Sequence, residues 1–356
     1  MSYSSGVEQH PHGAGKGKPD DMLPKVEPPG AGFIMQLFLI PMIIVLIIVV
    51  VWLMFSWLAH LGSDPRKLVE DISKGDKYGW QKASTLAELL RNREYEHLKS
   101  DKKLAGALAG TLTAQLDARE RGQQDDENQR MLRMFICRAL GEFYVDDGMP
   151  ALVEAAAGGE ESDIGVRRTA VESIAVLTRN VGSDRLRDKP SVVAALRQAS
   201  LERPSSGVDE NNAYADLRST SAFALGVLGG DEALDRLTQL LTDSYANARY
   251  NAATGLARHG DVRSIPVILE MLDPDNEEAV ALEESDVAID WKRSLVQENG
   301  MKAVGLLHTA NPQADYTQLV AALDRLSSSD AHSAIRQRAK FQADSLRGEA
   351  VPAATP

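Results

Sequence analysis

The longest run of hydrophobic positions lies between Phe33 and Leu61, where twenty-nine consecutive residues include no Asp, Glu, Lys or Arg. As a helix this stretch would extend about 43 Å, which exceeds the hydrocarbon layer of a bilayer, roughly 30 Å thick. The pattern therefore predicts a transmembrane helix over residues 33–61. A cleaved signal sequence has a shorter apolar region followed by a small-residue cleavage site, and Leu58-Ala-His-Leu61 offers no such site.

Beyond residue 62 the hydrophobic positions have a different spacing, because they recur every three or four residues as far as about Arg347. This spacing places them on one face of successive helices, whereas the alternation typical of strands is nearly absent. The pattern predicts an all-α fold over residues 63–347. Examples of the spacing are Leu86, Leu89 and Leu90, followed by Leu104, Leu108, Leu112 and Leu116.

Two ungapped internal matches indicate that the helical region is repetitive. Residues 218–229 recur as residues 249–260, with Arg, Ala, Leu and Gly at matching positions, and residues 133–154 align with residues 249–270. Each unit contains a helix of small and apolar residues, a short Gly/Asp turn and a second helix that often begins near a Pro. One such hairpin cannot bury both of its faces, so we expect neighbouring units to stack into a solenoid.

These repeated segments resemble HEAT-like repeats, of the short bacterial type also found in phycobilisome lyases. Residues 218–241 and 249–272 are the most typical, and Val166-Arg-Arg-Thr-Ala-Val171 is similar to another first helix. The resemblance implies an α-solenoid of HEAT-like helical hairpins after a single N-terminal transmembrane helix. Such a fold is compatible with many functions, so the resemblance alone does not assign one.

The resemblance also implies a role for a set of repeated charged residues. In this family a basic residue early in the first helix commonly pairs with an Asp in the preceding turn. Arg249 follows Asp243 in this way, and Asp163 precedes Arg167 similarly. We therefore expect Arg167, Arg218, Arg249 and Asp243 to form a structural ladder between repeats, because repeated residues usually serve the repeat itself.

The two ends of the chain and its charge change the picture further. Residues 1–32 are rich in Gly, Pro, Ser and Lys, and residues 348–356 are similar, so we expect both to be disordered. The formal net charge of −12 argues against nucleic-acid binding, which needs a basic surface. The single cysteine, Cys137, rules out an intramolecular disulfide framework.

Membrane orientation follows from the basic residues within about 20 positions of each end of the span. Three lysines precede it and four basic residues follow it, which slightly favours a cytoplasmic position for the soluble domain. We therefore expect a single-pass protein of the bacterial plasma (inner) membrane. The residues counted are Lys16, Lys18 and Lys25 before the span and Arg66, Lys67, Lys74 and Lys77 after it.

The sequence offers little catalytic chemistry. No two of the seven histidines share a helix at metal-ligand spacing, the His-Glu dipeptides of HEAT-like di-iron hydroxylases are missing, and no Gly-rich run ends in Gly-Lys-Ser or Gly-Lys-Thr. Cys137 has no identifiable base nearby. Residues 273–290 carry eight acidic residues and no basic one, but Glu278 stands where a calcium loop needs Gly. We expect a protein without metal or cofactor that is not an enzyme.

The pattern as a whole favours an interaction scaffold that holds a protein partner at the bilayer surface, with residues 33–61 in the lipid. Solenoids bind partners on extended concave faces, which we expect the second helices to line. The exposed polar positions there are predicted to include Glu154, Arg236, Gln239 and Glu270. Two alternatives stay open, namely a small-molecule sensor or bilin-lyase-like enzyme, and a purely structural component of a membrane assembly.

Overall fold

The computed structural model describes residues 30–60, 64–74, 78–122, 126–158, 163–203 and 207–348. The arm and tail predicted to be disordered lie outside these ranges, apart from residues 30–32 and Gly348. The chain divides into two compact units, Met1–Ser63 and Asp64–Pro356, which are treated separately below. Within the described ranges the secondary structure is helical, and no strand occurs.

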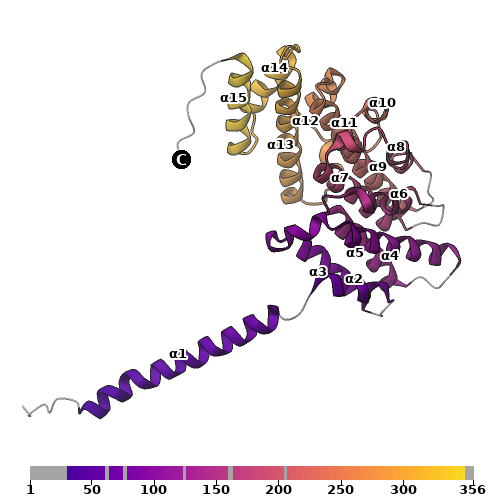
Figure 1. Ribbon diagram of the computed structural model, residues 1–356. Helices are drawn as coiled ribbons and strands as arrows, with labels where there is room; N and C mark the ends of the chain where they lie inside the picture. The colour runs from indigo at the N-terminus through magenta and orange to yellow at the C-terminus, as the bar shows by residue number, and fades with distance from the viewer. Residues whose placement is uncertain are drawn as a thin grey trace, which may run out of the picture. The chain divides into compact units, whose positions relative to one another are not determined.

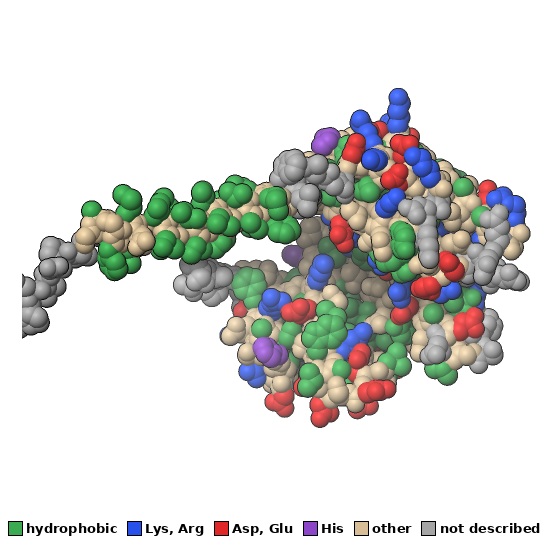
Figure 2. Space-filling model, turned by 90° about the horizontal axis from the view of Figure 1, so that it is seen from below, with side chains coloured by type: hydrophobic (Ala, Val, Ile, Leu, Met, Phe, Trp, Pro, Cys, Tyr) green, Lys and Arg blue, Asp and Glu red, His purple; other side chains and the backbone are tan. Residues whose placement is uncertain are grey.

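The first unit contains one helix, α1 (Ala31–His60), with Pro41 inside it. Its residues Ala31–Phe55 have a mean hydropathy of 3.3, and none of the most apolar window is buried. Hydrophobic side chains cover the visible surface of this helix (Figure 2). By length and composition α1 can cross a membrane, and an N-terminal signal sequence meets the same requirements.

The second unit is an array of helices that alternate between two layers (Figure 1). Odd-numbered helices contact one another in chain order and form the first-helix layer, while even-numbered helices form the second-helix layer beside it. The helices are α2 (Pro65–Ser73), α3 (Gly79–Arg91), α4 (Lys102–Glu120), α5 (Glu127–Gly141), α6 (Met149–Ala157), α7 (Ile164–Val181), α8 (Pro190–Ala199), α9 (Val208–Leu228), α10 (Asp231–Leu240), α11 (Ala246–Arg258), α12 (Ile265–Leu272), α13 (Asp286–Ala310), α14 (Thr317–Ser327) and α15 (Ser333–Arg347).

Local sequence explains where many of these helices begin. Asp64, Asp101, Asp126, Asp163 and Ser285 precede helices and accept hydrogen bonds from main-chain N–H groups of the first turn. Such caps satisfy donors that have no partner inside the helix. Four helices also carry Pro in the first turn, where the missing N–H has no cost: α2, α6, α8 and α12.

The first-helix layer is most closely packed where α9 meets α11. A Cβ added to Gly226 would lie 2.6 Å from the Cα of Gly255, so only Gly permits this approach of two backbones. The corresponding second helices, α10 and α12, make at most marginal contact. The first helices therefore approach each other more closely here than the second helices do, and our expectation that the second helices line the concave face stays a prediction.

The hydrophobic core changes at the same place. One cluster of buried residues extends from Val69 to Leu256, and a second extends from Tyr250 to Ala343, so the two clusters divide the buried residues of α11 between them. Leu256 belongs to the first cluster, whereas Tyr250 and Ala253 belong to the second. Helix α11 thus joins a longer N-terminal part of the array to a shorter C-terminal part formed by α12–α15.

Candidate functional site

A buried arginine lies in each of four successive first helices. Arg133, Arg167 and Arg218, in α5, α7 and α9, are at most 5% exposed, and the side chain of Arg249 in α11 is 11% exposed. Guanidinium groups are rarely buried unless they have partners, because transfer out of water is costly. The repeat therefore places a charged group inside the array in each of these four first helices.

Arg218 has the best-defined partner. Its Nε and Nη2 atoms donate to the two carboxylate oxygens of Asp243 at 2.9 and 3.0 Å, and both side chains are less than 10% exposed. The hydrogen bond with Asp243 raises the pKa of Arg218 above its ordinary value. This two-point geometry fixes the turn after α10 to helix α9 of the same repeat.

The pairing within the ladder differs from the one we expected. Asp243 offers its carboxylate to Arg218, and Arg249 instead donates to the main-chain oxygen of Asp243 at 2.9 Å. The guanidinium of Arg249 reaches Glu270 and Glu278, each at 2.5 Å. The carboxylate of Asp243 is already used within its own repeat, so the link to the next repeat runs through the backbone.

The second expected pair, Asp163 with Arg167, is also different. Asp163 caps α7 through Val166 N–H at 3.0 Å and accepts from Arg130 Nε at 2.6 Å. Arg167 donates its Nε to the carbonyl oxygen of Ala156 at 3.2 Å, and its buried Nη2 has no hydrogen-bond partner among the residues described. The carboxylate of Asp163 thus serves the helix cap with one oxygen and Arg130 with the other. The spacing along the chain could not reveal this arrangement.

The four residues predicted to contact a partner have internal bonds of their own. Arg236 is half-buried and donates to the hydroxyl and carbonyl oxygens of Ser200 at 2.8 and 2.7 Å, and burial lowers its pKa. Gln239 is exposed and accepts from Arg236 at 2.7 Å. Exposed Glu154 accepts from Thr113 Oγ1 at 2.9 Å, while half-buried Glu270 binds Arg249 and the hydroxyl of Tyr250. Their contact with a partner stays a prediction.

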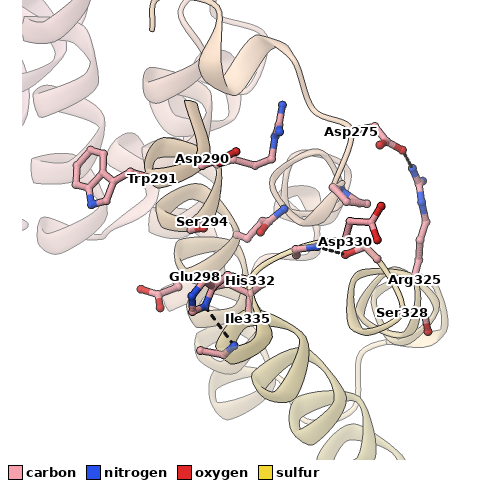
Figure 3. Close-up of a pocket in the computed structure, with 16 residues that line it drawn as sticks. Asp275, Asp290, Trp291, Ser294, Glu298, Arg325, Ser328, Asp330, His332 and Ile335 are labelled. Carbon is pink, nitrogen blue, oxygen red and sulfur yellow. Dashed lines mark hydrogen bonds and ion pairs between the residues drawn. The ribbon is translucent and has the colours of Figure 1, made fainter. Parts of the chain in front are cut away.

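A cavity of about 1060 Å³ lies between α13 and the turn that joins α14 to α15 (Figure 3). On one side Arg325 of α14 donates to Asp273 and Asp275, each at 2.8 Å. On the opposite side stands α13, and His332 and Ile335 come from the start of α15. Residues from three helices and two turns, far apart in sequence, therefore meet in one hollow.

Several polar groups of this cavity lack partners within the described part of the chain. Gln297 of α13 is 2% exposed, yet its Nε2 has no hydrogen-bond acceptor. The Nε of Arg293, one helical turn earlier, is also buried and has no hydrogen-bond acceptor among the described residues. Buried donors without acceptors are rare and costly in folded proteins. We call Arg293 and Gln297 the donor pair.

The turn before α13 and the first turns of α13 have unusual apolar exposure. Leu282, Val287 and Trp291 are 68%, 81% and 65% exposed, and we call them the α13 apolar strip. Trp291 points away from Arg325 (Figure 3) and still lines the cavity, so the strip adjoins the cavity on α13. Neighbouring exposed apolar residues are typical of surfaces that contact another molecule.

The described residues show little that could perform chemistry. No group of three His, Cys, Asp or Glu among them is placed to hold a metal ion. Cys137 is fully buried, and burial raises the pKa of its thiol to about 12, so the reactive thiolate is suppressed. That the chain works without metal, cofactor or catalysis stays a prediction.

Neither the donor pair nor the α13 apolar strip was predicted from the sequence. The sequence drew attention only to the acidic charge of residues 273–290, and α13 begins within this segment, at Asp286. The spacing of Val287 and Trp291, four residues apart, could have indicated a helix face. Nothing in the sequence could show that this face stays uncovered.

Comparison with known proteins decides the type of repeat. The family model described as HEAT repeats matches residues 210–285, which include α9 to α12 and the Arg218–Asp243 pair. The chain is a HEAT-like repeat protein. No curated protein matches it. A structure of human deoxyhypusine hydroxylase in complex with glycerol is similar at 18% identity, covering 80% of this chain and 98% of that chain. Its TM-score is 0.30, so this likeness carries no argument about activity.

Proposed function

We propose that this HEAT-like repeat protein is a membrane-anchored scaffold that binds a protein partner at the bilayer surface. The observation that carries the proposal is the α13 apolar strip. Leu282, Val287 and Trp291 lie within ten residues of one another on an otherwise charged surface. Aromatic side chains such as Trp291 contribute strongly to binding when a partner buries them.

Helix α1 supports the anchoring part of the proposal. A helix with a mean hydropathy of 3.3 over Ala31–Phe55 is more stable in lipid than exposed to water. Anchoring raises the effective concentration of a partner in the same membrane, so a modest affinity would suffice. In this proposal the repeat unit lies on the cytoplasmic side of the plasma membrane, as the basic residues near the span favour.

Site-specific photocrosslinking in the native membrane tests the proposal. A benzophenone amino acid replaces Trp291 in the full-length chain, and the matched control carries it at Phe341 of α15, which is 53% exposed. We expect one discrete protein to be crosslinked from position 291 and not from position 341. The absence of a discrete product from position 291, or equal products from both positions, would contradict the scaffold.

Alkaline extraction of the same membranes tests the anchor. The full-length chain should stay with the lipid, whereas a chain lacking residues 31–60 should be released. Protease added outside sealed cells should leave the repeat unit intact. Release of the full-length chain or digestion of the repeat unit from outside would each overturn the corresponding part of the proposal.

A further inference from the structure

The donor pair makes the cavity beside α13 an incomplete site. Gln297 is almost fully buried, and its side-chain amide has a donor without an acceptor in the described structure. A core position of that kind would be more stable with an apolar side chain of the same shape. Gln297 is one of the residues that line the cavity. We therefore looked for a ligand that would supply the missing acceptor.

The spacing of the donor pair matches the backbone of an extended peptide. Arg293 and Gln297 are four residues apart in α13, so their side chains leave the same face of the helix roughly 6 Å apart. Carbonyl oxygens on one side of an extended strand repeat about every 6.6–7 Å, because alternate residues point the same way. The carbonyls of two alternate residues, which point to the same side of a strand, can therefore accept from both donors.

The charges around the cavity favour a basic segment. Four carboxylates line it against two guanidinium groups. Two of these carboxylates are used internally, since Asp275 pairs with Arg325 and Glu298 pairs with Arg338 at 2.7 Å. The other two, Asp290 on α13 and Asp330 before α15, have no ion pair among the described residues (Figure 3). A cationic side chain could pair with the carboxylate of Asp290 or with that of Asp330.

We propose that this cavity binds an extended segment of a partner protein that carries Lys or Arg. Backbone carbonyls of the segment accept from Arg293 and Gln297, and its cationic side chains pair with Asp290 and Asp330. The volume of about 1060 Å³ is at the upper end of ordinary ligand pockets and has room for several residues. The inference rests on the proposed scaffold function and names the chemistry that its partner would present.

The test uses full-length protein in detergent micelles and three fluorescein-labelled peptides. Each peptide has ten residues, blocked ends and an identical Ala/Ser background, with two central residues that are Arg, Glu or Ala. Binding is measured by fluorescence anisotropy at low and moderate salt. We expect the Arg peptide to bind at least about tenfold tighter than the Ala peptide, with weaker binding at higher salt, and the Glu peptide not to bind.

Variants separate the two parts of the proposed site. Asp290→Asn with Asp330→Asn should abolish the preference for the Arg peptide. The matched control, Asp184→Asn with Asp231→Asn, removes the same charge from exposed positions elsewhere and should leave the preference unchanged. Gln297→Met should lower the affinity for the Arg peptide and for the Ala peptide alike, by about fivefold, and should raise the melting temperature of the protein.

Each contrary result is informative. Tighter binding of the Glu peptide, no peptide binding at millimolar concentration, or equal effects of the two double variants would overturn the inference. So would a Gln297→Met variant that melts earlier and binds normally, because the amide would then be structural. If crosslinking from position 291 still captures a partner, only this inference fails and the scaffold stands. If crosslinking from position 291 fails while the peptide result holds, the proposed scaffold function fails and the cavity still binds basic segments.

Discussion

Buried polar groups are satisfied in one part of the array and not in another. The two parts are the stretch from α9 to α11 and the stretch from α13 to α15. In the first, Arg218 and Asp243 satisfy each other with two hydrogen bonds, and Gly226 and Gly255 bring the helices into close contact. In the second, Gln297 has a buried donor beside a large cavity, and no described residue supplies its acceptor. The buried polar groups of the first stretch stabilise the fold, whereas the donor of the second stretch is available to bind another molecule.

The largest expected effect concerns the buried pair of the first stretch. Asp243→Ala leaves the guanidinium of Arg218 buried without its carboxylate, and breaking a buried ion pair in this way costs about 3–5 kcal/mol. Chemical denaturation of the full-length protein should show the loss of unfolding free energy. The control is Glu232→Ala, which removes the exposed partner of Arg197 and should cost less than about 1 kcal/mol. Equal effects of the two variants would mean that the ladder is not structural.

The close approach of α9 and α11 gives the second prediction. A Cβ at position 226 would press against the backbone of Gly255, so Gly226→Ala should cost about 1–3 kcal/mol through overpacking. The matched control is Gly106→Ala in α4, where a Cβ would meet nothing within 4 Å. This control should gain roughly 0.5–1 kcal/mol from helix propensity. Melting temperatures that shift in the same direction would contradict the packing described here.

These contrasts show how far sequence reasoning could reach. Repetition at residues 218–229 and 249–260 was enough to predict helical hairpins, because stacking repeats must bury the same positions each time. A ladder that includes Arg167, Arg218 and Arg249 was expected for the same reason, but the burial of these residues was not predicted. Their partners were not predicted either, since Asp163 serves a helix cap and Arg130 instead of Arg167. Pairing depends on three-dimensional distances that spacing along the chain does not fix.

The candidate site was harder to predict, because it does not repeat. The cavity beside the donor pair is formed by the approach of α13 to the turn between α14 and α15, and each residue alone is ordinary in sequence. Glu154, Arg236, Gln239 and Glu270 were predicted from exposure on second helices. Arg236 and Glu270 are half-buried and bonded within the fold, so charge reversal there would test stability as much as binding.

A third prediction tests capping at the N-terminal part of the array. The main-chain N–H of Leu104 is the largest of the influences that lower the pKa of Asp101, and Lys103 N–H and Arg66 act the same way. The ionised form therefore stabilises the fold at pH values above the unfolded pKa of about 3.9, and this contribution is lost as the pH falls through the lower folded pKa. Asp101→Ala should cost about 1 kcal/mol at pH 7 and less at strongly acid pH. A pH-independent difference between variant and parent would rule out the charge as the cause.

The smallest effect has the opposite sign and bears most directly on the comparison. Gln297→Met replaces a buried amide that has an unpaired donor with an apolar side chain of similar length, so unfolding should become harder by about 1 kcal/mol. The control is Ser221→Ala, since Ser221 Oγ is also buried but bonds to Leu217 O at 2.7 Å. Removing that satisfied hydroxyl should not stabilise the chain. A gain confined to Gln297→Met would show that the α13–α15 stretch keeps a destabilising group, which is the expected signature of a residue retained for binding.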